Sequence, residues 1–251
     1  PDKIVIGSKS KECFKVMRKL YSGLERPYMN ILETNWETSE MIKYANNSFL
    51  ATKISFINEI ANICDLVGAD VKVISKAMGM DYRISPKFLN AGIGYAGSCF
   101  PKDVRALVNT AKNQGYDAKL LNEVNELNER QKIMMLDKIK GRYEGDLNGK
   151  IFSILGLSFK PKTSDIREAV SLILIKELSM LGAKVKVYDP VANEEVQKVF
   201  GDKITYCESV DEVSKESNGL ILVTEWDEFR NVNFNKIAGN MVEKVMFDGR
   251  N

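Results

Sequence analysis

The residues best suited to chemistry lie in the segment Gly97-Ser98-Cys99-Phe100-Pro101-Lys102-Asp103. Its cysteine stands in a turn of small residues, immediately before Pro101 and a run of apolar residues that predict a helix. Free backbone N–H groups and the positive end of a helix dipole stabilise an anion at such a place, and Lys102 adds to that effect. The pattern favours a nucleophilic thiolate at Cys99, with a buried, inert cysteine as the alternative.

Lys43 and Asn47 form a second pair with possible chemistry. They are four residues apart in a segment of helical periodicity, so they share one helix face. From the spacing alone, a solvent-exposed ammonium beside an exposed amide is the simpler interpretation. Histidine is absent from the sequence, which excludes Ser–His and Cys–His mechanisms and leaves proton transfer to carboxylates, lysines, amides and water.

The four cysteines are far apart and show neither zinc-ligand spacing nor a disulfide framework, so we expect no metal site. Cys13 and Cys64 fall on the apolar sides of expected helices, and we assign both to the core. Cys207 follows an expected strand and is assigned no role.

Further segments, in a fixed order, match one protein family. They are Glu40–Asn47 with Phe49–Ala51, Gly79–Asp81 with Arg83, Lys87–Leu89, Gly156–Lys160 with Asp165 and Arg167, Thr224–Trp226, and Phe247–Arg250. Together with the cysteine segment, they make the chain resemble the UDP-glucose/GDP-mannose dehydrogenase family over essentially its whole length. Several matches in the right order are far more specific than any one of them.

The resemblance implies an NAD-dependent four-electron oxidation of UDP-glucose to UDP-glucuronate. Because two hydride transfers are needed, the intermediate aldehyde must be retained. In this scheme the Cys99 thiolate holds it as a thiohemiacetal, the second oxidation gives a thioester, and water hydrolyses the thioester. Lys43 and Asn47 would stabilise the developing oxyanion, and Asp103 would orient or activate water.

The same resemblance implies the binding residues. For the nucleotide sugar they are Phe88, Leu89, Asn90, Ala91, Gly92, Tyr95, Phe159, Lys160 and Arg250, together with Arg83, which would reach the substrate of a partner subunit. Lys102 and Arg167 are the expected cofactor contacts. The glycines at 92, 94 and 97 permit a close backbone approach. Ala96 departs from the glycine that is common in the family, which bears on the choice of sugar.

The expected fold class is α/β, with a central helical dimerisation domain followed by a Rossmann-like, parallel-sheet domain that binds the nucleotide sugar. We predict domains at 1–35 (a remnant of the NAD-binding domain), 36–147 and 148–251. The expected helices are 11–24, 39–67, 70–78, a helix that follows Cys99 and stops at Gly115, 118–141 and 168–181. The expected strands are 3–7, 28–32, 150–156, 184–188, 203–206, 219–224 and 244–248.

The resemblance also implies a dinucleotide-binding turn, but this sequence contains none. The nearest segment, Gly92-Ile93-Gly94 with Gly97, follows a polar stretch rather than a strand, so it does not match the fingerprint. We therefore expect the C-terminal part of a longer dehydrogenase that works as a homodimer.

Composition narrows the classes of protein to which the chain can belong. With 36 basic and 34 acidic residues among 251, 44% hydrophobic content and no long apolar run, we expect a cytoplasmic globular protein that binds neither nucleic acid nor membrane. Two alternatives stay open: a related dehydrogenase of GDP-mannose or a UDP-N-acetylhexosamine, and a non-catalytic nucleotide-sugar-binding and dimerisation fragment.

Overall fold

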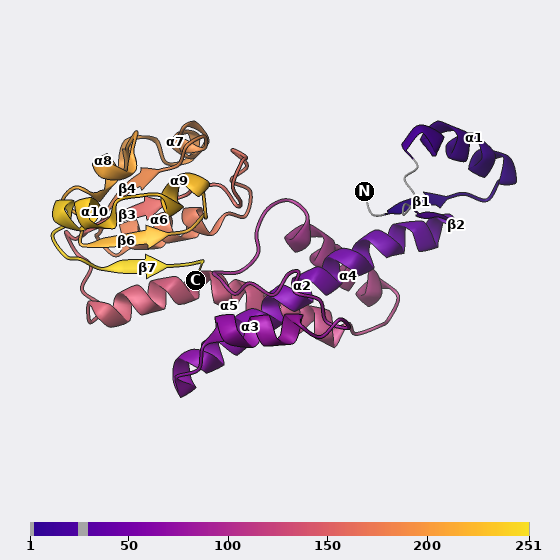
Figure 1. The fold of residues 1–251 in the computed structure, drawn as a ribbon, viewed down its shortest axis with the longest axis horizontal. Helices are drawn as coiled ribbons and strands as arrows, with labels where there is room; N and C mark the ends of the chain where they lie inside the picture. Colours follow the sequence, from indigo (N-terminus) through magenta and orange to yellow (C-terminus); the bar gives the residue numbers. More distant parts are fainter. Residues whose placement is uncertain (1–2, 25–29, 251) are drawn as a thin grey trace. The chain divides into compact units, whose positions relative to one another are not determined.

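The computed structural model describes residues 3–24 and 30–250 (Figure 1). The chain forms two compact units, residues 1–49 and 50–251. The long helix α2 (Trp36–Val67) begins in the first unit and ends in the second. The predicted division into three domains remains a prediction.

The first unit contains the parallel strands β1 (Lys3–Gly7) and β2 (Asn30–Thr34), paired in register from Lys3 opposite Asn30 to Gly7 opposite Thr34. Between them lie α1 (Lys11–Tyr21) and a 3₁₀ turn, η1 (Ser22–Leu24). The predicted strand 28–32 begins at Asn30 in the structure, and residues 28 and 29 lie outside the described residues.

Cys13 is exposed, so its assignment to the core was wrong. No residue of α1, which the structure describes in full, is buried, although its apolar residues follow helical spacing. The described strands of this unit offer too little apolar surface to cover a helix face.

The helical part of the second unit comprises the end of α2, α3 (Val71–Gly79), α4 (Phe100–Asn113) and α5 (Lys119–Arg142). These bounds lie close to the predicted ones. Asp70 caps α3, because its carboxylate accepts hydrogen bonds from the amides of Lys72 (2.7 Å) and Val73 (3.4 Å). Cys64 is buried on α2, as predicted.

The remainder of the second unit is a parallel sheet in the order β5-β4-β3-β6-β7. Its strands are β3 (Ile151–Leu155), β4 (Lys184–Tyr188), β5 (Thr205–Tyr206), β6 (Gly219–Leu222) and β7 (Met246–Asp248). The connecting helices are α6 (Val170–Met180), α7 (Asn193–Phe200), η2 (Gly201–Lys203), α8 (Val210–Ser214), α9 (Asp227–Arg230) and α10 (Phe234–Asn240). The α/β class and the Rossmann-like C-terminal part are thereby confirmed.

Both faces of this sheet are covered (Figure 1). Along β3, Phe152 and Ile154 pack with α6 and α7 on one face, whereas Leu155 packs with α8 and α10 on the other. This alternation follows from the two-residue period of a strand. Within the described residues, no helix is both long and apolar enough to cross a membrane.

Helix α5 joins the two parts of the second unit. Val124, in its first half, belongs to a cluster with Val104 of α4. Met135, Leu136 and Ile139, in its second half, belong to the main cluster of the sheet. One helix therefore places the segment that carries Cys99 relative to the sheet.

Candidate functional site

A cavity of about 790 Å³ lies at the carboxyl ends of β3, β6 and β7, where Leu155, Leu222 and Asp248 line it. In this sheet the chain proceeds from β3 to β4 on one side and later places β6 on the other, so the strand order reverses at β3. Open parallel sheets bind their ligands at such a reversal, outside the carboxyl ends of the strands.

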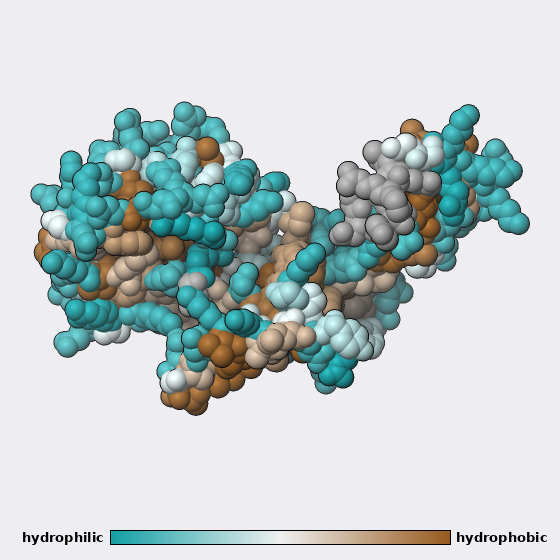
Figure 2. Space-filling view, in the orientation of Figure 1, coloured by the Kyte–Doolittle hydropathy of each residue, from teal (hydrophilic) through white to brown (hydrophobic). Residues whose placement is uncertain are grey.

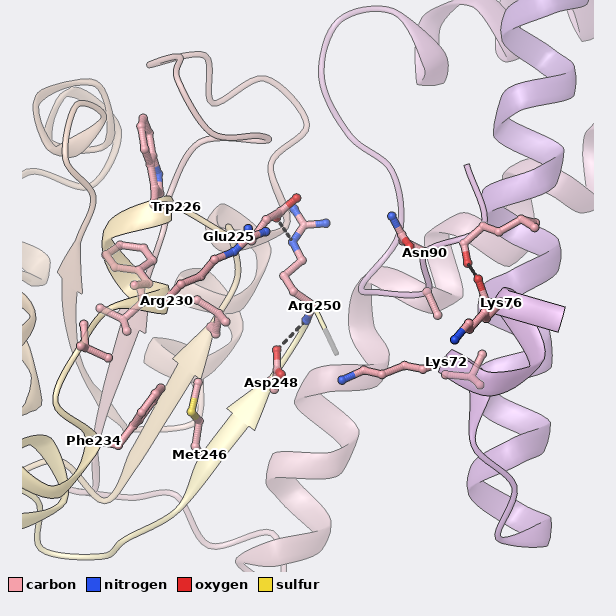
Figure 3. A pocket seen from close by; sticks show the side chains of 18 of the residues that line it. Lys72, Lys76, Asn90, Glu225, Trp226, Arg230, Phe234, Met246, Asp248 and Arg250 are labelled. Atoms are coloured by element: carbon pink, nitrogen blue, oxygen red, sulfur yellow. Dashed lines mark hydrogen bonds and ion pairs between the residues drawn. The ribbon is translucent and has the colours of Figure 1, made fainter. Parts of the chain in front are cut away.

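Two walls of different origin enclose the cavity (Figure 3). One wall comes from α3 and the loop after it, and includes Lys72, Lys76, Leu89, Asn90 and Ala91. The other comes from the sheet domain, and includes Glu225, Trp226, Arg230, Phe234 and Met246. Cationic side chains on both walls and aromatic side chains on one suit a ligand with a negatively charged part and a flat ring.

Arg250 extends between the two walls (Figure 3). Its Nε donates to the carbonyl of Val223 at 2.7 Å and lies 2.7 Å from Oε2 of Glu225. Burial lowers the pKa of the Arg250 guanidinium, while the charges of Glu225 and Asp248 act in the opposite direction. Among the described residues, Arg250 contacts its acceptors through Nε and its backbone amide. Its two terminal nitrogens, Nη1 and Nη2, therefore remain for a ligand.

The loop between α3 and α4 runs from this cavity to Cys99, and two glycines let it pass close to the sheet domain. A Cβ on Gly92 would lie 3.0 Å from the carbonyl oxygen of Gly249 and 3.7 Å from Nη1 of Arg250. A Cβ on Gly97 would lie 2.7 Å from the ring of Phe159. The close approach predicted for these glycines is thus made to the protein itself.

Cys99 is exposed and immediately precedes α4, with Pro101 in the first turn, as the sequence predicted. The backbone amide of Asp103 donates to the carbonyl of Cys99 at 2.8 Å. The Asp103 carboxylate is fully buried, and Nζ of Lys102 lies 2.6 Å from its Oδ1. A thiol at this position is accessible to a ligand that enters from solvent, whereas the carboxylate is buried and paired with Lys102.

The loop after β3 lies beside the thiol. Arg167 donates to both carboxylate oxygens of Asp165, at 2.9 and 2.6 Å, and its carbonyl accepts from the amide of Gly97 at 3.0 Å. The hydrogen bond to Asp165 is the largest cause of the raised pKa of Arg167, and negative charge on the Cys99 sulfur raises this pKa further. The structure therefore brings Arg167 to the turn that immediately precedes Cys99.

Several predicted residues lie elsewhere. The ring of Tyr95 is buried beside Phe100, and burial raises the pKa of its hydroxyl to about 12, so the loop presents its backbone rather than this side chain. Arg83 is exposed and paired with Asp81 at 2.6 Å. Lys43 and Asn47 lie on α2 within the first unit, and their place beside Cys99 remains a prediction.

Sequence reasoning missed part of the cavity. It gave no role to Lys72, Lys76, Arg230 or Phe234, and it used Trp226 only as a mark of resemblance. The spacing of Lys72 and Lys76 puts both on one face of α3, which was a usable signal. The described part of the chain holds no cluster of three or more His, Cys, Asp or Glu side chains able to bind a metal ion.

Comparison with known proteins gives consistent matches. Residues 37–130 match the central domain of the UDP-glucose/GDP-mannose dehydrogenase family, and residues 153–251 match the UDP binding domain of the same family. The chain is 43% identical over 250 residues to UDP-glucose 6-dehydrogenase TuaD of Bacillus subtilis, covering 100% of this chain and 53% of that protein. It is 41% identical to UDP-glucose 6-dehydrogenase of Pseudomonas aeruginosa, covering 100% of this chain and 56% of that protein.

Comparison with solved structures likewise finds sugar-nucleotide dehydrogenases. A UDP-glucose dehydrogenase from Pyrobaculum islandicum superposes with a TM-score of 0.92 at 33% identity, over 100% of this chain and 56% of that one. A UDP-D-ManNAc dehydrogenase from Pyrococcus horikoshii superposes with a TM-score of 0.84 at 26% identity, over 100% of this chain and 56% of that one. The chain spans about half the length of the curated relatives it matches.

Proposed function

Since the chain belongs to the UDP-glucose/GDP-mannose dehydrogenase family, we propose that it supplies the nucleotide-sugar site and the nucleophilic thiol for NAD-dependent oxidation of UDP-glucose to UDP-glucuronate. One observation carries the proposal: the cavity at the strand ends, with Arg250 between its walls, is connected by a single loop to the exposed thiol of Cys99. The group that would bind an anion and the nucleophile therefore lie at the two ends of one loop.

In this proposal the UDP part occupies the cavity. The terminal nitrogens of Arg250 bind the diphosphate, because a guanidinium can donate two parallel hydrogen bonds to phosphate oxygens. Lys72 and Lys76 add positive charge from the opposite wall. The backbone from Phe88 to Gly92, with that of Tyr95, lies along the nucleotide sugar, and Phe159 and Lys160 close the site from the sheet domain.

The glucose part extends along the loop toward Cys99. The oxidation removes a hydride from C6 and a proton from its hydroxyl, which gives an aldehyde. The Cys99 sulfur then bonds to C6, the second hydride leaves, and water cleaves the resulting thioester so that the thiolate is restored. Lys43 and Asn47 stabilise the negative charge on the C6 oxygen, and Asp103 orients the water.

NAD would accept the two hydrides, and the chain's own residues make only part of a site for it. The predicted cofactor contacts Lys102 and Arg167 both face carboxylates, those of Asp103 and Asp165. Residues 92–97 follow irregular backbone rather than a strand, so they do not form a dinucleotide-binding turn. We place most of the NAD site in a part of the protein outside these residues.

We also propose a homodimer through the helical part. Large apolar side chains are exposed at the end of α2, along α3 and in the turn after it, and Figure 2 shows hydrophobic surface gathered there. They include Ile63, Leu66, Val67, Val73, Met80 and Tyr82. Arg83, the predicted contact to a partner's substrate, directly follows this set. Light scattering should give twice the mass of one chain, and a monomer at micromolar concentration would contradict the dimer.

The half-length match to the curated relatives favours a second reading for the 251 residues taken alone, that of a binding module without turnover. Calorimetric titration tests the site under either reading. We expect UDP and UDP-glucose to bind, with GDP at least tenfold weaker. Equal binding of GDP would point to the related GDP-mannose dehydrogenases, and tighter binding of a UDP-N-acetylhexosamine to that class of substrate. NADH formation from NAD and UDP-glucose by this chain alone would exclude the module reading.

A further inference from the structure

The loop that connects the cavity to Cys99 is held by amide side chains from two helices. The amide of Gly92 donates to Oδ1 of Asn58 on α2 at 2.8 Å, and its carbonyl accepts from Nε2 of Gln131 on α5 at 2.7 Å. The amide of Tyr95 donates to Oδ1 of Asn128 at 2.8 Å, and its carbonyl accepts from Nδ2 of the same side chain at 3.0 Å. Side chains thus take the place of a neighbouring strand for both loop residues.

These amide side chains are buried, and they form hydrogen bonds with the loop. Asn58, Asn128 and Gln131 are 1%, 2% and 6% exposed, and a buried amide destabilises a fold unless it is hydrogen-bonded. Nδ2 of Asn58 has no partner among the described residues, so Gly92 is the group that this side chain serves. Asn62 donates to Oε1 of Gln131 at 2.9 Å and so turns Nε2 of Gln131 toward Gly92.

The opposite side of the loop is pressed against the sheet domain. Gly92 approaches Gly249 and Arg250 so closely that a Cβ would lie 3.0 Å from the Gly249 carbonyl oxygen. Gly94, at φ +93, would place a Cβ 2.9 Å from Oδ1 of Asn128. The amides on one side therefore decide how near the loop lies to Arg250 on the other. Past Tyr95, the ring contact with Phe100 (5.9 Å between centroids) reaches the first residue of α4.

We propose that Asn58, Asn128 and Gln131 are positioning residues for the nucleotide-sugar site: they fix the path of residues 92–97 between Arg250 and Cys99. The inference rests on the proposed function for its role and on the hydrogen bonds for its mechanism. Because an amide does not ionise, these hydrogen bonds to the loop do not themselves depend on pH.

The variant Asn128→Asp makes the hydrogen bonds to the loop depend on pH, so that their effect on UDP-glucose affinity can be measured. A protonated carboxyl can donate to the Tyr95 carbonyl and accept from the Tyr95 amide, as Asn128 does, whereas a carboxylate cannot donate and repels the carbonyl oxygen. Burial raises the pKa of such a carboxyl, while the ammonium of Lys132, one turn later on α5 and paired with Glu129 and Glu168, acts in the opposite direction. We expect UDP-glucose affinity close to the unmodified chain at acidic pH, and at least tenfold weaker affinity than the unmodified chain once the carboxyl has ionised.

Asn125→Asp is the matched control, because it makes the same change one turn earlier on α5 without a hydrogen bond to the loop. Its affinity should stay within threefold of the unmodified chain at every pH. Gln131→Glu repeats the test at Gly92 and serves if Asn128→Asp does not fold. An affinity ratio that does not change with pH in the folded variants would overturn the proposal.

Hydrogen exchange separates this inference from the proposed function. The peptide that contains residues 92–97 should exchange several-fold faster in Asn128→Asp at the pH where affinity is lost, and at the unmodified rate in Asn125→Asp. Weaker binding with unchanged exchange would show that the loop path is not the cause. If the unmodified chain does not bind UDP-glucose, the proposed function fails, while the exchange comparison still decides whether the amides hold the loop.

Discussion

The backbone amide of Gly97 donates to the carbonyl of Arg167 over 3.0 Å, which ties the turn before Cys99 to the loop that follows β3. Gly97 has φ +83, and a Cβ on it would lie 2.7 Å from the ring of Phe159. The turn can take this position only because residue 97 has no side chain.

Gly97→Ala should therefore destabilise the chain and weaken UDP-glucose binding. Gly115→Ala is the matched control, since Gly115 has φ +78 and nothing within 4 Å of a Cβ. The control should lose about 1–2 kcal/mol from backbone strain alone. Gly97→Ala should lose more in urea unfolding, and Phe159→Leu in the same chain should restore part of the difference. Equal losses in the two alanine variants would show that the ring contact does not matter.

Arg250→Lys keeps the positive charge but removes the two terminal nitrogens that we assign to the diphosphate. Hydrogen bonds to charged groups contribute about 1.5–3 kcal/mol, so UDP affinity should fall at least tenfold. Uridine affinity should change less than threefold, because uridine carries no phosphate. Arg230→Lys, on the same cavity, is the control and should change UDP affinity less than threefold. Calorimetry measures these three changes in affinity, and an equal loss for UDP and uridine in Arg250→Lys would contradict the assignment.

The four cysteines should differ sharply in their reaction with iodoacetamide at pH 8. Cys13 and Cys99 are exposed, whereas Cys64 and Cys207 are buried, and burial raises the pKa of the Cys207 thiol to about 11. Because the thiolate is the reactive form, Cys207 should be alkylated only when the chain unfolds. Peptide mass spectrometry should find labels on Cys13 and Cys99. UDP-glucose should slow the labelling of Cys99 and leave that of Cys13 unchanged; equal protection of both would refute a site at Cys99.

In the complete enzyme, Cys99→Ser should abolish formation of the acid and leave UDP-glucose affinity within a few-fold. A serine hydroxyl at this position is far less ionised than a thiol, so it does not capture the aldehyde. The measurement is UDP-glucuronate produced per mole of enzyme, with nucleotide binding as the control for folding. Acid formation at a near-normal rate would mean that no covalent step passes through Cys99.

Lys43→Ala should act on the transition state rather than on binding. If Lys43 faces the oxygen that gains charge, kcat should fall by about 10²-fold or more while KM changes little. Steady-state kinetics of the complete enzyme separates the two parameters. A large rise in KM at unchanged kcat would instead make Lys43 a binding residue, and its place on α2 would then serve the nucleotide sugar alone.

The elements that fix the site were largely readable from the sequence, because their signals are local. The apolar run of β3 and the turn before α4 each depend on neighbours within a few residues. The predicted helices and strands accordingly lie close to those of the structure. The ordered motifs added the family, which the domain matches confirm.

Only the tertiary structure decided which distant residues those elements contact. Helical spacing on α1 placed Cys13 on an apolar side, but only the size of the surface opposite decides burial, and Cys13 is exposed. Arg250 acquires its setting from Val223 and Glu225 at the end of another strand, and Gly92 and Tyr95 are held by amides 33 to 39 residues away. Local periodicity shows which face of an element is apolar; which groups that face touches depends on how distant segments pack, and that sets the charge, burial and reach of every residue in the site.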